Sequence, residues 1–202
     1  IPKVRTVIPE VKISCKDDSS RVNTQTAKGA GLGNPEARYE RTLHNAGFWF
    51  VDEMARRFSG QFRYEKRFDA DICKVSVGGA DVWLVKPQSY MNLSGQPIRG
   101  VLDYYRLMPT ELLVAHDEID LPPGTVRLKA GGGHGGHNGL RDIIRHCGND
   151  FMRLRIGIGH PGHRDDVTGH VLKPPSRPTL APPPRLGAEV GVRWAAPSDA
   201  GQ

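Results

Sequence analysis

The segment Gly131-Gly132-Gly133-His134-Gly135-Gly136-His137-Asn138-Gly139-Leu140 constrains the fold more than any other part of the chain. Six of its first nine residues are glycine. Glycine loses the most backbone freedom on folding, so such a run is useful where the chain turns with positive φ or approaches another group closely. Apolar residues then recur at the spacing of a buried helix face, at Leu140, Ile143, Ile144 and Cys147. The sequence predicts a glycine loop entering a helix N-terminus, where N–H groups and the helix dipole attract an anion. The alternative is a flexible surface loop that carries two histidines.

Outside this segment, the middle of the chain predicts strands that alternate with helices. Apolar residues at helical spacing indicate helices over residues 45–58 and 98–105. Apolar or alternating runs indicate strands over residues 73–77, 81–86, 112–115, 125–129 and 154–158. Gly78-Gly79 is a hairpin signal between the first two strands. This alternation predicts a single-domain α/β fold with a mostly buried, mixed β-sheet.

Composition limits the class of protein. A chain of 202 residues, 38% of them hydrophobic, can bury one core and suits a soluble protein. Its apolar runs are shorter than a membrane span, and its first residues lack the apolar core of a signal peptide. The three cysteines are odd in number and have no C-x-x-C spacing, which argues against a disulfide framework and a zinc site. We therefore expect a cytoplasmic protein that does not bind membranes.

Positive charge is unevenly distributed along the chain, whose formal net charge is +6. Residues 121–164 hold seven arginines and lysines against two aspartates. A basic stretch that includes the glycine loop is consistent with binding of phosphate groups on a nucleic acid. A solvated charged face is the structural alternative.

Five polar residues stand at predicted strand ends and helix starts, where α/β proteins place their sites. They are His44, Asp117 and the asparagines Asn34, Asn92 and Asn138. Individually, each has a structural alternative as a turn residue, a helix cap or a strand end. Together they supply a histidine base, an acid that can orient it, and amides that hydrogen bond without changing charge. This set favours hydrolysis by a water molecule that the histidine activates.

Other chemistries fit the sequence less well. It has no G-x-S-x-G motif for a serine nucleophile and no phosphate-binding loop of the G-x-x-x-x-G-K-[ST] type. Gly31-x-Gly33 lacks the third glycine of a dinucleotide-binding fingerprint. His134 and His137 have a spacing that could hold a metal, but carboxylate partners are not evident. A metal site therefore remains the less favoured alternative.

Six motifs, in order along residues 31–173, make the chain resemble the bacterial-type peptidyl-tRNA hydrolase family. They are Gly31-Leu32-Gly33-Asn34-Pro35, Thr42-Leu43-His44-Asn45-Ala46-Gly47, Met91-Asn92-Leu93-Ser94-Gly95, His116-Asp117-Glu118-Ile119-Asp120-Leu121-Pro122-Pro123-Gly124, the glycine loop, and Leu154-Arg155-Ile156-Gly157-Ile158-Gly159-His160-Pro161. Their kept order makes the resemblance specific. It implies a monomeric α/β enzyme with a twisted mixed sheet surrounded by helices. Such an enzyme hydrolyses the ester between a peptide and the 3′ ribose of tRNA, and so recycles the tRNA.

The resemblance also implies which residues act in catalysis. His44 is the expected general base, Asp117 the acid that orients it, and Asn34 a catalytic residue that contacts the peptide or the attacking water. Four further residues are expected to bind the substrate in the same cleft, namely Asn92, Asn138, Tyr39 and Met91.

For the nucleic acid, the resemblance implies binding through Lys129, Arg155 and His137, with the first two at the tRNA 5′ phosphate. The expected partner is the acceptor stem and 3′ end of peptidyl-tRNA. The resemblance implies no metal, and we expect no cofactor.

Both ends of the chain depart from the family pattern. Residues 1–28 are polar, and residues 174–202 hold seven of the sixteen prolines and show no helical or strand period. We therefore divide the chain into an atypical N-terminal extension (1–28), a catalytic domain (29–173) and a proline-rich tail (174–202) expected to be disordered. Three alternatives stay open: a weakly active variant with altered ends, a non-catalytic RNA-binding relative on the same fold, and a nucleotide-binding module that uses the glycine loop.

Overall fold

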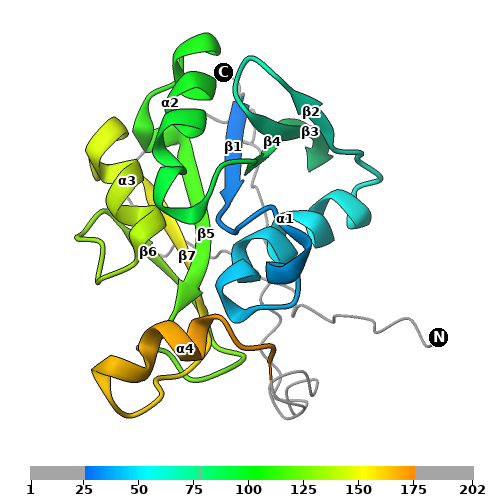
Figure 1. Cartoon of the computed structure of the whole chain (residues 1–202). Helices are drawn as coiled ribbons and strands as arrows, with labels where there is room; N and C mark the ends of the chain where they lie inside the picture. The colour runs from blue at the N-terminus through cyan, green and yellow to red at the C-terminus, as the bar shows by residue number, and fades with distance from the viewer. Residues whose placement is uncertain (1–25, 78, 176–202) are drawn as a thin grey trace, which may run out of the picture.

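A seven-stranded sheet with helices on both faces forms the described part of the chain, residues 26–77 and 79–175 of a computed structural model (Figure 1). The strand order is β2-β3-β4-β1-β5-β7-β6. Four neighbouring strands run parallel: β4 (Ala80–Pro87), β1 (Thr26–Gly31), β5 (Leu112–Glu118) and β7 (Met152–Gly157). Three more strands pair antiparallel: β3 (Ala70–Val77) with β4, β2 (Arg63–Glu65) with β3, and β6 (Val126–Ala130) with β7. The predicted mixed sheet of an α/β domain is confirmed.

Each face of the sheet is closed by its own apolar core. On one face, α2 (Gly95–Tyr104) and α3 (Asn138–Cys147) place Ile98, Val101 and Ile143 against the sheet. On the other face, α1 (Ala46–Arg57) packs Phe50 and Val51 against β3, β4 and β5. The short helix α4 (Val167–Val171) lies beyond the carboxyl end of β5 (Figure 1). Five 3-10 turns complete the structure: Ala37–Tyr39, Leu43–Asn45, Met91–Leu93, Pro109–Glu111 and Arg164–Asp166.

The central strand β1 is the least expected element of the sheet. Its sequence is polar and glycine-rich, yet it pairs in parallel with β4 on one side and β5 on the other. The boundary that we set between residues 28 and 29 therefore falls inside a strand that begins at Thr26. Lys28 is buried in this strand, with its ammonium group over the rings of Tyr105 and Trp83. Cross-strand pairing on both sides thus specifies β1 where its own residues do not.

Two glycines let the chain pass close enough to place the site. A Cβ atom on Gly31, at the end of β1, would overlap the backbone of Gly47 in α1. A Cβ atom on Gly47 would overlap the backbone of both Ala115 and Leu32. The backbone at the start of α1 therefore contacts the backbone at the ends of both β1 and β5. This contact holds the turn that precedes α1 against the carboxyl ends of the two strands.

The predicted elements are largely present, with some differences. The helices over 45–58 and 98–105 correspond to α1 and α2, and the strands over 73–77 and 81–86 to β3 and β4. The strand predicted over 112–115 continues through His116 and Asp117 to Glu118, so our placement of its end at Ala115 was wrong. β2 and β1 were not predicted as strands, and the short helix α4 was not predicted either. The predicted disorder of the tail lies outside the described residues.

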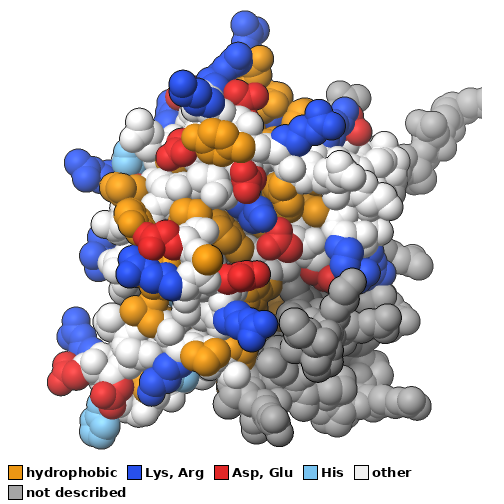
Figure 2. Space-filling view, turned by 45° about the vertical axis from the view of Figure 1, so that its right-hand side comes forward, with side chains coloured by type: hydrophobic (Ala, Val, Ile, Leu, Met, Phe, Trp, Pro, Cys, Tyr) orange, Lys and Arg blue, Asp and Glu red, His pale blue; other side chains and the backbone are white. Residues whose placement is uncertain are grey.

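Charge on the outer surface is mixed. Basic, acidic and apolar side chains are interspersed over the face shown in Figure 2. In the part of the chain that the structure describes, no helix is both long and apolar enough to cross a membrane.

Candidate active site

A large cavity opens at the carboxyl ends of β1 and β5. Its volume is about 1010 Å³, and its walls come from the glycine loop, α3, α4 and the turns that follow β1 and β4. All ten residues to which the sequence assigned a role line it: Asn34, Tyr39, His44, Met91, Asn92, Asp117, Lys129, His137, Asn138 and Arg155. Segments that are far apart in the sequence therefore meet at one site.

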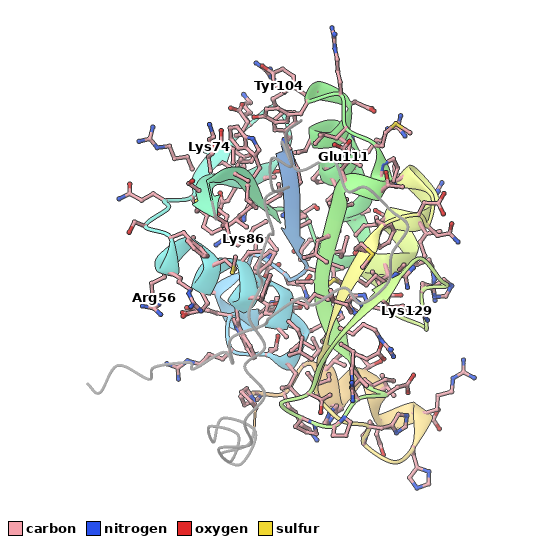
Figure 3. All side chains as sticks on the ribbon, turned by 180° about the vertical axis from the view of Figure 1, so that it is seen from behind. Arg56, Lys74, Lys86, Tyr104, Glu111 and Lys129 are labelled. Atoms are coloured by element: carbon pink, nitrogen blue, oxygen red, sulfur yellow. The ribbon has the colours of Figure 1, made fainter. Side chains whose placement is uncertain are left out.

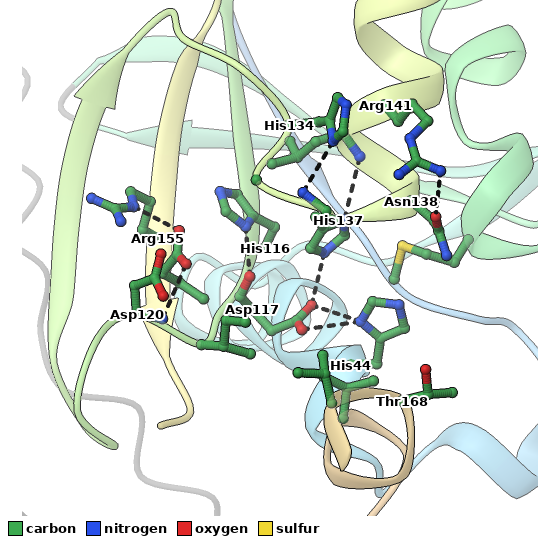
Figure 4. A pocket seen from close by; sticks show the side chains of 18 of the residues that line it. His44, His116, Asp117, Asp120, His134, His137, Asn138, Arg141, Arg155 and Thr168 are labelled. Carbon is green, nitrogen blue, oxygen red and sulfur yellow. Dashed lines mark hydrogen bonds and ion pairs between the residues drawn. The ribbon is translucent and has the colours of Figure 1, made fainter. Parts of the chain in front are cut away.

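At the floor of the cavity, one buried carboxylate is shared by two histidines. Nδ1 of His44 lies 2.9 Å from Oδ1 and 3.0 Å from Oδ2 of Asp117. Nε2 of His137 lies 2.9 Å from Oδ1 of the same carboxylate. The two imidazole rings are 4.9 Å apart between centroids. In Figure 4 the second ring nitrogen of His44 points away from Asp117, on the side of Asn138.

Hydrogen bonding determines where the protons of the two histidines lie. His137 caps α3, and its Nδ1 accepts the backbone N–H of Leu140. Its Nε2 must therefore carry the proton that is donated to Asp117. His44 donates Nδ1–H to the same carboxylate, which leaves Nε2 unprotonated in the neutral ring. The geometry thus prepares His44 Nε2 to accept a proton.

The electrostatics of the site keep Asp117 ionised and His116 neutral. Burial by itself would raise the pKa of Asp117. Electrostatic attraction to His137 and His44, together with their hydrogen bonds, instead holds this pKa well below its usual range. Burial, with a smaller contribution from His137, lowers the pKa of His116 to about 4. Nδ1 of His116 hydrogen bonds to the backbone carbonyl of Asp117. A neutral His116 therefore supports the strand end without adding charge beside the carboxylate.

Asn34 is fixed by a second asparagine, Asn45, to which the sequence analysis assigned no role. Asn45 accepts the Asn34 backbone N–H and donates its own amide to the Asn34 carbonyl, both at 2.9 Å. The side-chain oxygen of Asn34 accepts the backbone N–H of Met91 at 2.7 Å. Asn34 thus connects the turn before α1 to the turn that carries Met91 and Asn92. The Nδ2 group remains as the part of Asn34 that can contact a ligand.

The glycine loop is held from below by a buried guanidinium. Arg153 of β7 donates to the carbonyl groups of Gly132 and Gly133. Gly131, Gly132, Gly135 and Gly136 all have positive φ, as expected for this run. The loop ends at His137, and Asn138 is the first residue of α3. Asn138 therefore stands at the positive end of a helix dipole beside the cavity.

A row of cations lies on β6 and β7 at one side of the cavity. Lys129 of β6 lies opposite Arg153 of β7 in the antiparallel register. Arg155 follows two residues after Arg153 and lies on the same face of the sheet. Nε of Arg155 donates to Oε2 of Glu118 at 2.8 Å. Lys129 is exposed, whereas Arg153 is buried beneath the glycine loop. The cavity thus has a histidine–carboxylate floor and one basic wall.

His44, Asp117 and His137 are also the one group of side chains in the described residues that could hold a metal ion. Their ligand atoms lie within 4.8 Å of one another. A metal at Nε2 of His137 would move the proton to Nδ1, where it would face the N–H of Leu140. The arrangement therefore favours a hydrogen-bonded network over metal coordination. His134, which the sequence paired with His137 as a possible ligand, is not part of this group.

Sequence reasoning did not assign roles to three residues that support the site: Asn45, Glu118 and Arg153. Asn45 lies next to His44, and Glu118 next to Asp117, inside motifs that were recognised. Arg153 belongs to the basic stretch, which gave its charge but not its partners. The available signals were thus position beside a candidate residue for Asn45 and Glu118, and positive charge for Arg153.

The fold and the site together define an α/β enzyme with a histidine–carboxylate pair in a large polar cavity. Comparison with known proteins gives the family: residues 29–183 match the family model described as peptidyl-tRNA hydrolase. The chain is 57% identical over 148 residues to the peptidyl-tRNA hydrolase of Halorhodospira halophila, covering 73% of this chain and 76% of that protein. It is 53% identical over 148 residues to the enzyme of Haemophilus influenzae, covering 72% and 76%.

Solved structures agree with this match. The crystal structure of peptidyl-tRNA hydrolase from Acinetobacter baumannii superposes with a TM-score of 0.75 at 45% identity, covering 80% of this chain and 82% of that one. The chain belongs to the peptidyl-tRNA hydrolase family. The family, fold class and enzyme class expected from the sequence are confirmed, as is the expected activity on the ester bond of peptidyl-tRNA.

Proposed function

We propose that the cavity is the active site for hydrolysis of peptidyl-tRNA, with His44 as general base and Asp117 as the acid that orients it. The observation that carries this proposal is the contact of His44 Nδ1 with the Asp117 carboxylate, at 2.9 Å, in a cavity lined by Asn34, Asn92 and Asn138. Asp117 holds the tautomer in which Nε2 can take a proton, and it stabilises the imidazolium that forms.

In the proposed reaction, a water molecule next to His44 Nε2 attacks the carbonyl carbon of the ester. His44 takes one proton from the water as the C–O bond to the attacking oxygen forms. The tetrahedral intermediate then expels the ribose oxygen, and the imidazolium returns the proton to it. The products are the peptide with a free carboxyl group and tRNA with a free ribose hydroxyl.

Negative charge develops on the carbonyl oxygen during attack, and we expect Asn138 to stabilise it. The residue begins α3, so its amide and the positive end of the helix dipole lie on the same side of the cavity. The Nδ2 group of Asn34 is the corresponding candidate to hold the attacking water, because its Oδ1 is already bonded to Met91.

The peptide is expected to lie between the turns that carry Tyr39 and Met91–Leu93. Neutral amides such as Asn92 suit a peptide of variable sequence, because they can bind main-chain groups without selecting a side-chain charge.

The tRNA acceptor stem is expected to lie along the basic wall. Lys129 and Arg155 are diagonal neighbours across β6 and β7, a placement that allows both to reach one phosphate. Such contacts would recognise tRNA by charge and shape rather than by base sequence. His137 is bonded to Asp117, so its contribution to tRNA binding would come through the start of α3.

The test is release of an N-acetylated amino acid from N-acetyl-aminoacyl-tRNA. We expect His44→Ala to lower kcat by roughly 10²- to 10⁴-fold, the usual contribution of a general base. His163→Ala is the matched control, because His163 is exposed and is not among the residues that line the cavity.

A His44→Ala variant with near-full activity would end the assignment of the base. If the unaltered protein binds tRNA in a salt-dependent way and releases no product, it is the non-catalytic relative. A cytoplasmic location, a monomeric state and the absence of a cofactor stay predictions.

A further inference from the structure

Arg155 is held by only part of its guanidinium group. Its Nε donates to Oε2 of Glu118 at 2.8 Å, and among the described residues its two Nη groups make no hydrogen bond. In Figure 4 these terminal nitrogens point away from that bond. A guanidinium offers two edges to an anion, and the edge formed by the two Nη groups is the one left open.

Glu118 is itself fixed by the backbone. Its second oxygen, Oε1, accepts the N–H of Asp120 at 3.2 Å. The side chains of Arg155 and Glu118 are 23% and 17% exposed, so the pair lies at the wall of the cavity rather than free in solvent. Burial opposes ionisation of Glu118, but the hydrogen bonds from Arg155 and Asp120 hold its pKa below the usual value. The carboxylate is therefore an anchored, charged acceptor.

We propose that Glu118 is a positioning residue, which fixes Nε of Arg155 so that both Nη groups face the 5′ phosphate of the tRNA. The inference rests on the proposed function, in which Arg155 and Lys129 bind that phosphate. A free arginine side chain has many rotamers, and ordering it on binding weakens affinity. Glu118 orders Arg155 before the substrate arrives.

The negative charge of Glu118 also has an effect that opposes phosphate binding. A carboxylate beside an arginine also reduces the local positive charge and could compete with the phosphate. The two effects predict opposite results when Glu118 is removed. Positioning predicts weaker selection for the phosphate, and competition predicts stronger selection.

The experiment compares two forms of an N-acetyl-aminoacyl-tRNA, one with its 5′ phosphate and one without. The measured quantity is the phosphate preference, the ratio of kcat/KM for the two forms. For Glu118→Ala we expect this preference to fall by roughly three- to tenfold, the usual cost of ordering one long side chain. The fall should come from a higher KM for the phosphorylated form rather than from kcat.

Two further substitutions separate geometry from charge. Glu118→Gln keeps an oxygen that can accept from Nε, so the preference should be restored. Glu118→Asp keeps the charge but is one methylene shorter, so the preference should fall as it does for Ala. Because Gln and Asp are closer in shape to Glu, they test the proposal even if the Ala variant does not fold.

Glu53→Ala is the matched control. Glu53 pairs with Nε of Arg56 at 2.7 Å on the exposed side of α1. In Figure 3, Arg56 lies on the opposite side of the molecule from Lys129. Loss of the Glu53 carboxylate should leave the phosphate preference unchanged.

The outcomes are distinct. An unchanged or increased preference in Glu118→Ala overturns the positioning role while leaving Arg155 as a phosphate contact. If the unaltered enzyme shows no preference and Arg155→Ala changes nothing, the proposed phosphate contact itself is wrong, and the positioning role falls with it.

Discussion

Lys28 in β1 and Arg153 in β7 are the two buried cations of the described chain, and they differ in their hydrogen-bond partners. The two Nη groups of Arg153 donate to two carbonyl groups of the glycine loop, and only its Nε has no partner among the described residues. The ammonium of Lys28 has no hydrogen-bond acceptor among the described residues, and it contacts the ring of Tyr105 at 3.2 Å and that of Trp83 at 5.0 Å. A buried charge is tolerated where its hydrogen bonds are satisfied and is costly where they are not.

The difference separates a cation that serves the site from one that the fold merely contains. Arg153 supports the loop that ends at His137. Lys28 lies on β1 with its ammonium group over Tyr105 and Trp83, two side chains that pack against the core, and burial lowers its pKa from 10.5 to about 7. Replacing each cation with methionine should therefore change the free energy of unfolding in opposite directions.

The largest effect is expected for Lys28→Met, which should raise the free energy of unfolding at pH 7 by about 3 kcal/mol. A shift of one pKa unit corresponds to about 1.4 kcal/mol, and part of the gain is offset by the lost contact with Tyr105. Urea unfolding measures the change. Lys74→Met, which removes an exposed lysine of β3, is the control and should change stability little. A Lys28→Met protein less stable than the parent would show that the aromatic contacts outweigh desolvation.

The pH dependence of stability tests the same amine without a substitution. Between pH 7 and pH 10.5 the unfolded chain keeps the Lys28 proton, whereas the folded chain has lost it. Stability therefore rises with pH, by about 2 kcal/mol from pH 7 to pH 9. Below pH 7 both states are protonated, and the contribution is constant at its most unfavourable value.

Measurement should stop at pH 9, because burial raises the pKa of Cys147 to about 11 and this thiol opposes the trend at higher pH. Subtracting the curve of Lys28→Met isolates the lysine. Parallel curves for the two proteins would show that Lys28 titrates normally.

The same contrast explains what the sequence could predict. The helices and strands with apolar periodicity, such as α1, α3 and β4, were predicted because their signal is local. β1 was not, because a polar strand acquires its place from β4 and β5 on either side. β5 was ended too early, since His116 and Asp117 have the polarity of a loop but are buried by the histidines and backbone groups around them.

The candidate site shows the same division. Its ten assigned residues were found from motifs, and all of them line one cavity. The supporting residues were missed because their partners are distant in the sequence: Arg153 bonds a carbonyl 20 residues away, and Glu118 bonds an arginine 37 residues away. Motifs identify the groups that meet substrate, whereas pairings of this kind require the fold.

Arg153→Met should have a smaller effect on stability than Lys28→Met or the change of pH. It should lower the free energy of unfolding by about 1 kcal/mol. The lost hydrogen bonds to Gly132 and Gly133 are partly compensated by burial of an apolar side chain and by water at the exposed loop. Activity should fall further, by roughly tenfold in kcat/KM, because the loop that positions His137 and Asn138 loses its support. Arg145→Met, on the exposed face of α3, is the control. Full activity in Arg153→Met would mean that the positive-φ glycines alone hold the loop, and that the two buried cations differ in stability but not in function.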